Sequence, residues 1–294
     1  MTEMEKVTLT TFTDPMMGLS YECEPVYRRL EVRFGGQIEF RTVMAGLVRD
    51  VSDFMTQEEC SLGPEEGVRR YCARLAGIYK SEEAIAGLPI RMEGFHLFDA
   101  EHRSSYPLCI ACEAAKLTDP GRAEAFLYRL RYATIAETRQ TTREEELARV
   151  ARLSGFDEDA FLRHFRDGSA EAAFREDLAL TREAGIRGLP MCLVQYENRR
   201  ARISPLNGYD ALADAIRTVS EGAVRPREVV DKVQALDDLL AKHPLISRME
   251  VRFALDLSEG ELRLLLRPYI KRGRVLELET EDFYQASNPA RDET

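Results

Sequence analysis

Two regions of strand-like sequence, separated by a long helical region, most constrain how this chain folds. Residues Val7–Phe12 are rich in β-branched and aromatic side chains and run into Asp14-Pro15, which is typical of a buried strand that ends in a turn. From Ser20 to Phe34 apolar residues recur at helical spacing, so this segment is expected to be a helix. Residues Ile38–Met44 then alternate like a second strand. The β-α-β order predicts that the two strands lie parallel in one sheet.

Strand-like sequence returns only near residue 190. Residues Met191–Tyr196 and Arg200–Ser204 flank a turn at Glu197-Asn198, as in an antiparallel hairpin, and Gly208–Val219 predicts one more helix. Between the two regions, from about residue 46 to 187, turn signals divide amphipathic sequence into four or five predicted helices. The predicted fold class is therefore α/β, a thioredoxin-like sheet interrupted by a large helical insert, within a first domain of residues 1–222.

A second domain is predicted for residues 223–294, after a linker at Glu221–Pro226. Ser258 and Glu261 have the spacing of a capping box, and Pro268 predicts a kink or an early end of the helix that follows. Three helices followed by a strand indicate a winged-helix-like α+β domain. The predicted segments are Arg227–Lys242, Ser247–Leu255, Ser258–Lys271 and the strand Val275–Glu279.

The composition argues against several classes of protein. A net charge of −10 is unfavourable for a general nucleic-acid binder, and residues 226–294 hold eleven Lys and Arg against fourteen Asp and Glu. A local basic stripe around the third predicted helix of this domain stays open as a DNA-binding alternative. No run of about eighteen apolar residues is present to span a membrane, and Met1–Lys6 is charged with no apolar core behind it. We therefore expect a cytoplasmic protein without membrane contact. The stripe is Arg263, Arg267, Lys271, Arg272 and Arg274.

Three segments carry a family resemblance over about residues 5 to 220. Asp14–Tyr21 reads DPMMGLSY, Gly188-Leu189-Pro190 lies just before a predicted strand, and Ser105–Ala115 reads SYPLCIACEAA. These segments resemble the DsbA-like thioredoxin-fold family, including its FrnE-like or dithiol-disulfide isomerase branch, whose first strand ends in D-P-x-C-x-x-C-Y. The resemblance implies a cis-proline loop at Pro190. It also places Met17 where that family has its nucleophilic cysteine and Ser20 where it has the resolving one.

These two replacements remove the expected redox chemistry. A thioredoxin-type cysteine acts as a thiolate that is stabilised by a helix amino terminus and is later released by the second cysteine. The thioether of Met17 has no ionisable proton, and the alcohol of Ser20 cannot resolve a mixed disulfide. We therefore expect no catalytic residue here. What remains is a hypothetical apolar groove for a protein or peptide, with packing of the methionines in the core as the alternative. The groove residues would be Met16, Met17, Leu19, Leu189 and Pro190.

Cys109 and Cys112 are the candidate redox residues that survive. They form a C-x-x-C in the first turns of a predicted helix, whose dipole could lower a thiol pKa. We favour the interpretation that the two cysteines lie on a packed helix face, because their neighbours in the sequence are apolar. A zinc site would need two further ligands at matched spacing, and none is evident. We expect no metal and no cofactor. Glutathione stays open at Ser20, because distant relatives of the family, kappa-type glutathione transferases and hydroxychromene carboxylate isomerases, activate it with a serine near this turn.

Two functional hypotheses follow. The first is a non-catalytic thioredoxin-fold protein that binds a protein or peptide partner as an adaptor or regulator. The domain order, a DsbA-like domain without its cysteines followed by a winged-helix-like tail, resembles that of the Spx adaptors of the ClpXP protease. The alternative is an enzyme of the same fold, either a thiol-disulfide oxidoreductase or dithiol-disulfide isomerase that uses Cys109 and Cys112, or a glutathione-dependent protein that uses Ser20.

Overall fold

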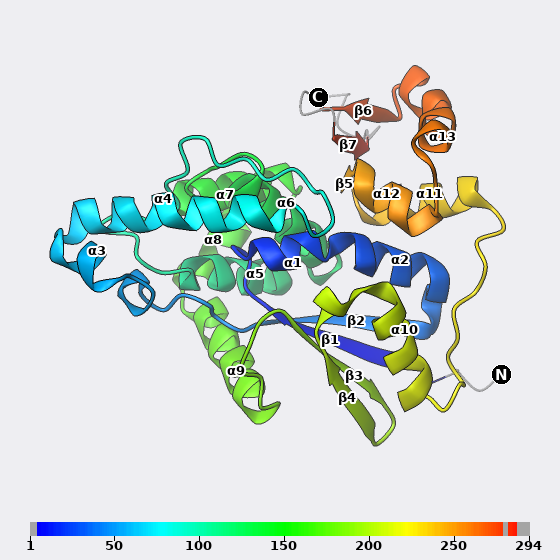
Figure 1. Cartoon of the computed structure of the whole chain (residues 1–294), viewed down its shortest axis with the longest axis horizontal. Coiled ribbons are helices and arrows are strands. Elements are labelled where there is room, and N and C mark those ends of the chain that lie inside the picture. Colours follow the sequence, from blue (N-terminus) through cyan, green and yellow to red (C-terminus); the bar gives the residue numbers. More distant parts are fainter. Residues whose placement is uncertain (1–4, 279–281, 287–294) are drawn as a thin grey trace.

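A four-stranded sheet organises the structure, a computed structural model that describes residues 5–278 and 282–286 (Figure 1). Its strands are arranged in the order β2-β1-β3-β4. β2 runs parallel to β1, and β3 and β4 form an antiparallel hairpin beside β1, so the βαβ unit and the hairpin expected from the sequence are both confirmed. The strands are β1 (Val7–Thr13), β2 (Ile38–Met44), β3 (Met191–Tyr196) and β4 (Arg199–Ile203).

Two helices cover one face of this sheet. Leu9 of β1 lies beside Phe40 of β2 and Val194 of β3, and these side chains pack against α2 (Glu24–Phe34) and α10 (Gly208–Val219). The single helix predicted for Ser20–Phe34 is in fact divided at Cys23 into α1 (Gly18–Glu22) and α2. Pro25, in the first turn of α2, has no N–H to continue the hydrogen-bond ladder from α1, which accounts for the break.

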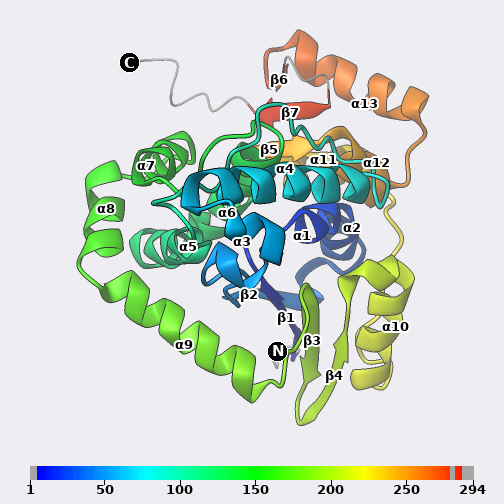
Figure 2. The same cartoon turned by 60° about the vertical axis from the view of Figure 1, so that its left-hand side comes forward.

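Seven α-helices lie between β2 and β3 in the chain, more than the four or five expected. The helix α3, for example, is only five residues long. It lies between the capping box of Thr56 and Glu59 and the residue Gly63, and it is too short to show helical periodicity in the sequence. α5 packs against α8 and α9 (Figure 2). Buried aromatic side chains fill the core of the insert. The helices are α3 (Gln57–Ser61), α4 (Pro64–Glu82), α5 (Tyr106–Thr118), α6 (Ala123–Ile135), α7 (Glu144–Leu153), α8 (Glu158–Arg166) and α9 (Ser169–Glu183).

The described residues of the carboxyl-terminal unit form three helices and a small sheet of order β5-β7-β6. Its first helix starts later than predicted because Asp231 caps it, accepting hydrogen bonds from the backbone of Val233 and Gln234. The capping box of the third helix is present, and Pro268 does not end that helix. Glu279, the predicted last residue of the strand in this unit, lies outside the described residues. The elements are α11 (Lys232–Lys242), β5 (Leu245–Ser247), α12 (Arg248–Leu255), α13 (Glu259–Lys271), β6 (Val275–Glu277) and β7 (Phe283–Ala286).

A buried arginine joins the sheet domain, the insert and the carboxyl-terminal unit. α12 packs along α2 (Figure 1), and Arg28 of α2 points into this contact with only 1% of its side chain exposed. Burial alone would raise the pKa of Glu31, but Arg28 and His243 more than offset it and hold the pKa at about 2. The partners of Arg28 are Glu24 (2.7 Å), Glu124 (3.0 Å), His243 (3.0 Å), Glu250 (3.1 Å) and Glu31 (3.3 Å).

The fold predicts that Arg28→Met is strongly destabilising. The substitution leaves buried carboxylates without their cation, so the free energy of unfolding should fall by about 3–5 kcal/mol in urea denaturation. Arg41→Met is the matched control, because Arg41 is 60% exposed and pairs with Glu39 at the surface, where a loss below about 1 kcal/mol is expected. Equal losses in the two variants would contradict the assignment of Arg28 as the central buried cation.

Among the described residues, none of the helices is long and apolar enough to cross a membrane.

Candidate functional site

Asp14 fixes the turn that follows β1, which is where the family resemblance places the redox site. Its carboxylate is fully buried and accepts hydrogen bonds from the backbone of Met16 (3.1 Å) and Leu47 (2.7 Å) and from the hydroxyl of Ser105 (2.7 Å). Burial raises the pKa of Asp14, while these donors oppose the rise. Asp14 thus ties β1 to the segment after β2 and to the start of α5, a structural role that the sequence did not indicate.

Met17 and Ser20 occupy the two positions expected for cysteines, and they contact each other. The hydroxyl of Ser20 donates to the sulfur of Met17 (3.8 Å) and accepts from Thr13 (2.8 Å), and Arg131 of α6 donates to Thr13 (2.8 Å). Arg131 in turn pairs with Glu24. The serine is therefore engaged in a buried chain of hydrogen bonds, with 1% of the residue exposed to solvent.

α4 covers this turn from outside. The hydroxyl of Tyr79 donates to the carbonyl oxygen of Met16 (2.5 Å), and a Cβ at Gly18 would lie 2.0 Å from Glu82 Oε2, so a larger residue there would displace the Glu82 carboxyl group. Both methionines lie in the protein interior, with 1% and 6% exposure for Met16 and Met17. The sequence hypothesis of an open groove built on these two side chains does not describe this structure, which has them packed instead.

The proline loop lies where the resemblance put it. The Leu189–Pro190 peptide bond is cis and leads directly into β3, whose first residue, Met191, pairs with Phe12 of β1. Pro190 is buried, and Leu189, like Leu19 on α1, is partly exposed. Of the five residues predicted to form the groove, only the two leucines are thus partly exposed.

Two carboxyl groups beside the covered turn were not anticipated from the sequence. Burial raises the pKa of Glu22 to about 8, although the backbone N–H groups of Ala86 and Leu88 donate to it, and burial raises the pKa of Glu82 to about 7. One oxygen of each, Glu22 Oε1 and Glu82 Oε2, has no hydrogen-bond partner among the described residues. In the sequence both look like ordinary polar positions on helices.

Cys109 and Cys112 lie inside the core of the insert. Burial raises the pKa of both thiols, and the thiol of Cys109 also donates to the carboxylate of Asp14 (3.4 Å), which disfavours its thiolate further. A reactive cysteine needs the opposite environment, with exposure and a lowered pKa. The arrangement of this pair corresponds to a packed helix face.

One cluster within the described residues has the spacing of metal ligands. Atoms of Glu31, Glu124 and His243 lie within 4.8 Å of one another. A nitrogen of Arg28 is within hydrogen-bond distance of all three, at 3.3, 3.0 and 3.0 Å. The guanidinium already serves as the cation of this cluster and would repel a metal ion, so we assign no metal here.

The sheet topology, the cis-proline loop and the strand-to-helix turn define a protein of the thioredoxin class. A family model described as thioredoxin (Thioredoxin_5) matches residues 10–213, and the chain belongs to this family. Among individual relatives, the chain is similar to two proteins named ClpXP adapter protein SpxH. The one from Shouchella clausii is 25% identical over 90% of this chain and 83% of that protein, and the one from Halalkalibacterium halodurans is 21% identical over the same shares.

A solved structure supports the same fold. The cytosolic disulfide reductase DsbM from Pseudomonas aeruginosa superposes with a TM-score of 0.55 and 20% identity, covering 74% of this chain and all of DsbM. Its complex with GSH gives a TM-score of 0.52 and 23% identity over 73% of this chain and 99% of that one. At this level of identity, the likeness concerns the DsbA-type α/β fold with its helical insertion.

Thiol titration checks the environment of the cysteines. Five of the six cysteines are buried and Cys60 is exposed, so one thiol should react rapidly with Ellman's reagent in the native protein and all six should react after denaturation. Cys60→Ala should abolish the rapid phase. Rapid labelling of Cys109 or Cys112, located by mass spectrometry, would contradict the burial of the pair and favour the oxidoreductase alternative.

The raised pKa values predict how stability depends on pH. Glu22 and Glu82 have an ordinary pKa of 4.5 but titrate near 8 and 7 in the folded protein. Between pH 5 and pH 8 the folded state therefore binds more protons than the unfolded state. The contribution of Glu22 and Glu82 to the free energy of unfolding consequently falls as the pH rises through this range. Glu22→Gln should raise that free energy by about 4 kcal/mol at pH 8 and by about 1 kcal/mol at pH 5.

Chemical denaturation at both pH values measures this effect. Glu58→Gln is the control, because the Glu58 side chain is 80% exposed and its substitution should leave the pH dependence unchanged. A Glu22→Gln protein with the same pH dependence as the wild type would show that Glu22 is ionised in the folded state over the whole range.

Proposed function

We propose that this protein is a non-catalytic thioredoxin-fold adaptor, which binds another protein and presents it to the ClpXP protease in the cytoplasm. The observation that carries the proposal is the contact between Met17 and Ser20, the residues at the two cysteine positions. A thioether and a hydrogen-bonded alcohol replace the pair that would exchange disulfides, and α4 covers them. A fold that keeps its sheet and its proline loop without this chemistry is suited to recognition.

The similarity to proteins named as ClpXP adapters supports this choice, because it extends over 90% of the chain, beyond the part that matches the thioredoxin family model. The rival function is thiol-disulfide exchange, as in the DsbM reductase. It would require a thiolate, and burial raises the pKa of Cys109, Cys112 and Cys192. We therefore propose that neither a redox cofactor nor glutathione takes part in the function.

We also propose that residues 223–294 form a winged-helix domain, separate from a DsbA-like domain of residues 1–222. The order helix, strand, helix, helix, strand, strand supports this assignment, with β5 pairing to the β6-β7 hairpin. Residues 223–231 contain neither helix nor strand and connect the two domains. Because acidic residues outnumber basic ones in the second domain, we propose a role in protein contact rather than in DNA binding.

A degradation assay tests the adaptor function. Purified ClpXP is supplied with a protein that co-purifies with this chain, and addition of this chain should increase the initial rate at which ClpXP degrades that protein. A reference protein that does not co-purify with this chain should be degraded at an unchanged rate. An unchanged rate for the co-purified protein over a range of adaptor concentrations would contradict the proposal.

Insulin reduction and binding of reduced glutathione test the rival function in parallel. We expect the wild type to be indistinguishable from buffer in both. Disulfide reduction that disappears in Cys109→Ala, or glutathione binding that disappears in Ser20→Ala, would establish an enzyme in place of an adaptor.

A further inference from the structure

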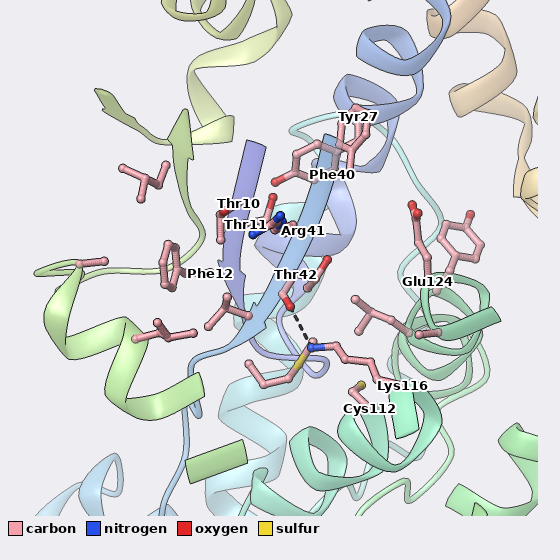
Figure 3. A pocket seen from close by; sticks show the side chains of 18 of the residues that line it. Thr10, Thr11, Phe12, Tyr27, Phe40, Arg41, Thr42, Cys112, Lys116 and Glu124 are labelled. Atoms are coloured by element: carbon pink, nitrogen blue, oxygen red, sulfur yellow. Dashed lines mark hydrogen bonds between the residues drawn. The ribbon is translucent and has the colours of Figure 1, made fainter. Parts of the chain in front are cut away.

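The cleft beside β2 shows how positive charge is compensated inside this protein. The cleft has a volume of about 1340 Å³, and Figure 3 shows Lys116 and Glu124 among the side chains that line it. Lys116 pairs with Glu113 at 2.6 Å. Arg28, another lining residue, pairs with Glu124 at 3.0 Å. Because these charges are neutralised within the protein, we do not assign the cleft to an anionic partner.

The segment of residues 262–276, in α13 and β6, carries positive charge without this compensation. It contains five basic residues and no acidic one. Two of the five, Arg263 and Arg274, pair at the surface with carboxylates from outside the segment. The other three have neither an ion pair nor a side-chain hydrogen bond within the described residues. These three are Arg267, Lys271 and Arg272, and all of them are exposed.

The outward face of α13 presents part of this charge. The opposite face packs into the core of the carboxyl-terminal unit through Leu262 and Leu266, which are buried. Leu264, Arg267 and Lys271 follow one another at steps of three and four residues and therefore lie in one row on the outward face. Figure 1 and Figure 2 both place α13 at the outer end of this unit, so the row is open to a partner.

Apolar side chains are exposed in the same segment. Leu264 is 70% exposed, and Ile270 and Leu276, which lies on the adjoining strand β6, are exposed as well. Exposed apolar side chains that are bordered by charged ones are typical of surfaces that bind another protein. The surface around Leu264 thus combines apolar contact area with unpaired positive charge.

Acidic residues on both sides limit the length of this positive surface. Glu259 and Glu261 lie in the first turn of α13, and Glu277 ends β6. Between them, the outward row of α13 is only about 12 Å long. A nucleic acid or an anionic membrane carries its charge over a much longer distance and would meet these carboxylates. A short acidic segment of a protein matches the surface in both length and sign.

We propose that the outward face of α13 binds a short acidic segment of a partner protein, which also supplies an apolar side chain. The inference rests on the proposed function, in which the segment belongs to the protein that is delivered. Arg267 and Lys271 pair with the carboxylates of the segment, and Leu264 packs against its apolar side chain. Recognition then takes place in the carboxyl-terminal unit, and the covered turn at Met17 is not part of it.

A displayed library of random peptides, selected against the full-length protein, tests the proposal without a known partner. Enriched peptides should be acidic with a large apolar residue, should bind more weakly at high salt, and should slow amide hydrogen exchange in α13. A doubly reversed protein, which combines Arg267→Glu with Lys271→Glu, should bind a synthetic enriched peptide at least about tenfold more weakly than the wild type does.

Three controls separate charge, apolar contact and general effects. Leu264→Ala keeps the charges and should weaken binding of the same peptide about threefold. Arg163→Glu should leave binding unchanged, because Arg163 on α8 is likewise exposed and has no ion pair in the described part of the chain. A peptide with Lys in place of each acidic residue should bind the doubly reversed protein more tightly than the wild type. All variants should have similar stability in urea denaturation, because the substituted side chains are exposed.

A DNA duplex and vesicles that contain phosphatidylserine are the probes for the other anionic partners. The proposal is overturned if the selection yields no acidic peptides, if the protected amides lie outside α13, or if the doubly reversed protein binds the peptide as the wild type does. It is also overturned if the charge reversal abolishes binding of the duplex or the vesicles instead of the peptide.

The degradation assay distinguishes failure of this inference from failure of the adaptor function. Full stimulation of ClpXP by the doubly reversed protein, with normal binding of the co-purified protein, would overturn recognition at α13 and leave the adaptor function standing. Loss of both stimulation and binding in the doubly reversed protein, with both kept in Arg163→Glu, would support the two together. A wild type that does not stimulate ClpXP would contradict the adaptor function alone, since the peptide measurements do not involve ClpXP.

Discussion

The structure depends on a buried guanidinium that has too many partners to be a local ion pair. Arg28 contacts glutamates from its own helix, from the insert and from the carboxyl-terminal unit, together with His243. An unpaired charge in such a place would be very costly, so each of the three regions needs the others to remain folded around it. Hydrophobic contacts favour the close approach of α2 and α12. The positive charge of Arg28 requires that acidic side chains lie at this contact.

The same network reaches the site where the family has its chemistry. Glu24 links Arg28 to Arg131, and Arg131 donates to Thr13, which donates to Ser20. In a reactive thioredoxin the corresponding helix terminus stabilises a thiolate. Here the neighbouring groups are a thioether, an alcohol and the carboxyl group of Glu82, whose pKa is raised to about 7. None of these groups can replace the thiolate as the nucleophile that attacks a substrate disulfide. The packed turn therefore holds these side chains in one arrangement.

Local sequence patterns predicted the sheet, the hairpin and several helix ends outside the insert, because each depends on neighbouring residues, whereas the cis-proline loop was implied by the family resemblance. Alternation locates β2, and the capping box of Ser258 and Glu261 locates the start of α13. The covered turn could not be predicted in this way. Arg28 and Arg29 are adjacent and look alike in the sequence, yet only Arg28 is fully buried in an ionic cluster, since that depends on which distant helix packs there. Glu82 and Asp14 are similar cases, with partners or neighbours more than sixty residues away.

The contact of α12 with α2 should hold the two parts of the chain together after proteolytic cleavage. The connecting segment at residues 223–231 is irregular and holds exposed residues, so a protease would cleave it readily. Scission there would not free two independent modules, because Glu250 and His243 would remain bound to Arg28 of the other fragment. The two pieces should migrate together as a nicked complex, and a gene fragment encoding either piece alone would give a product that lacks its counterion.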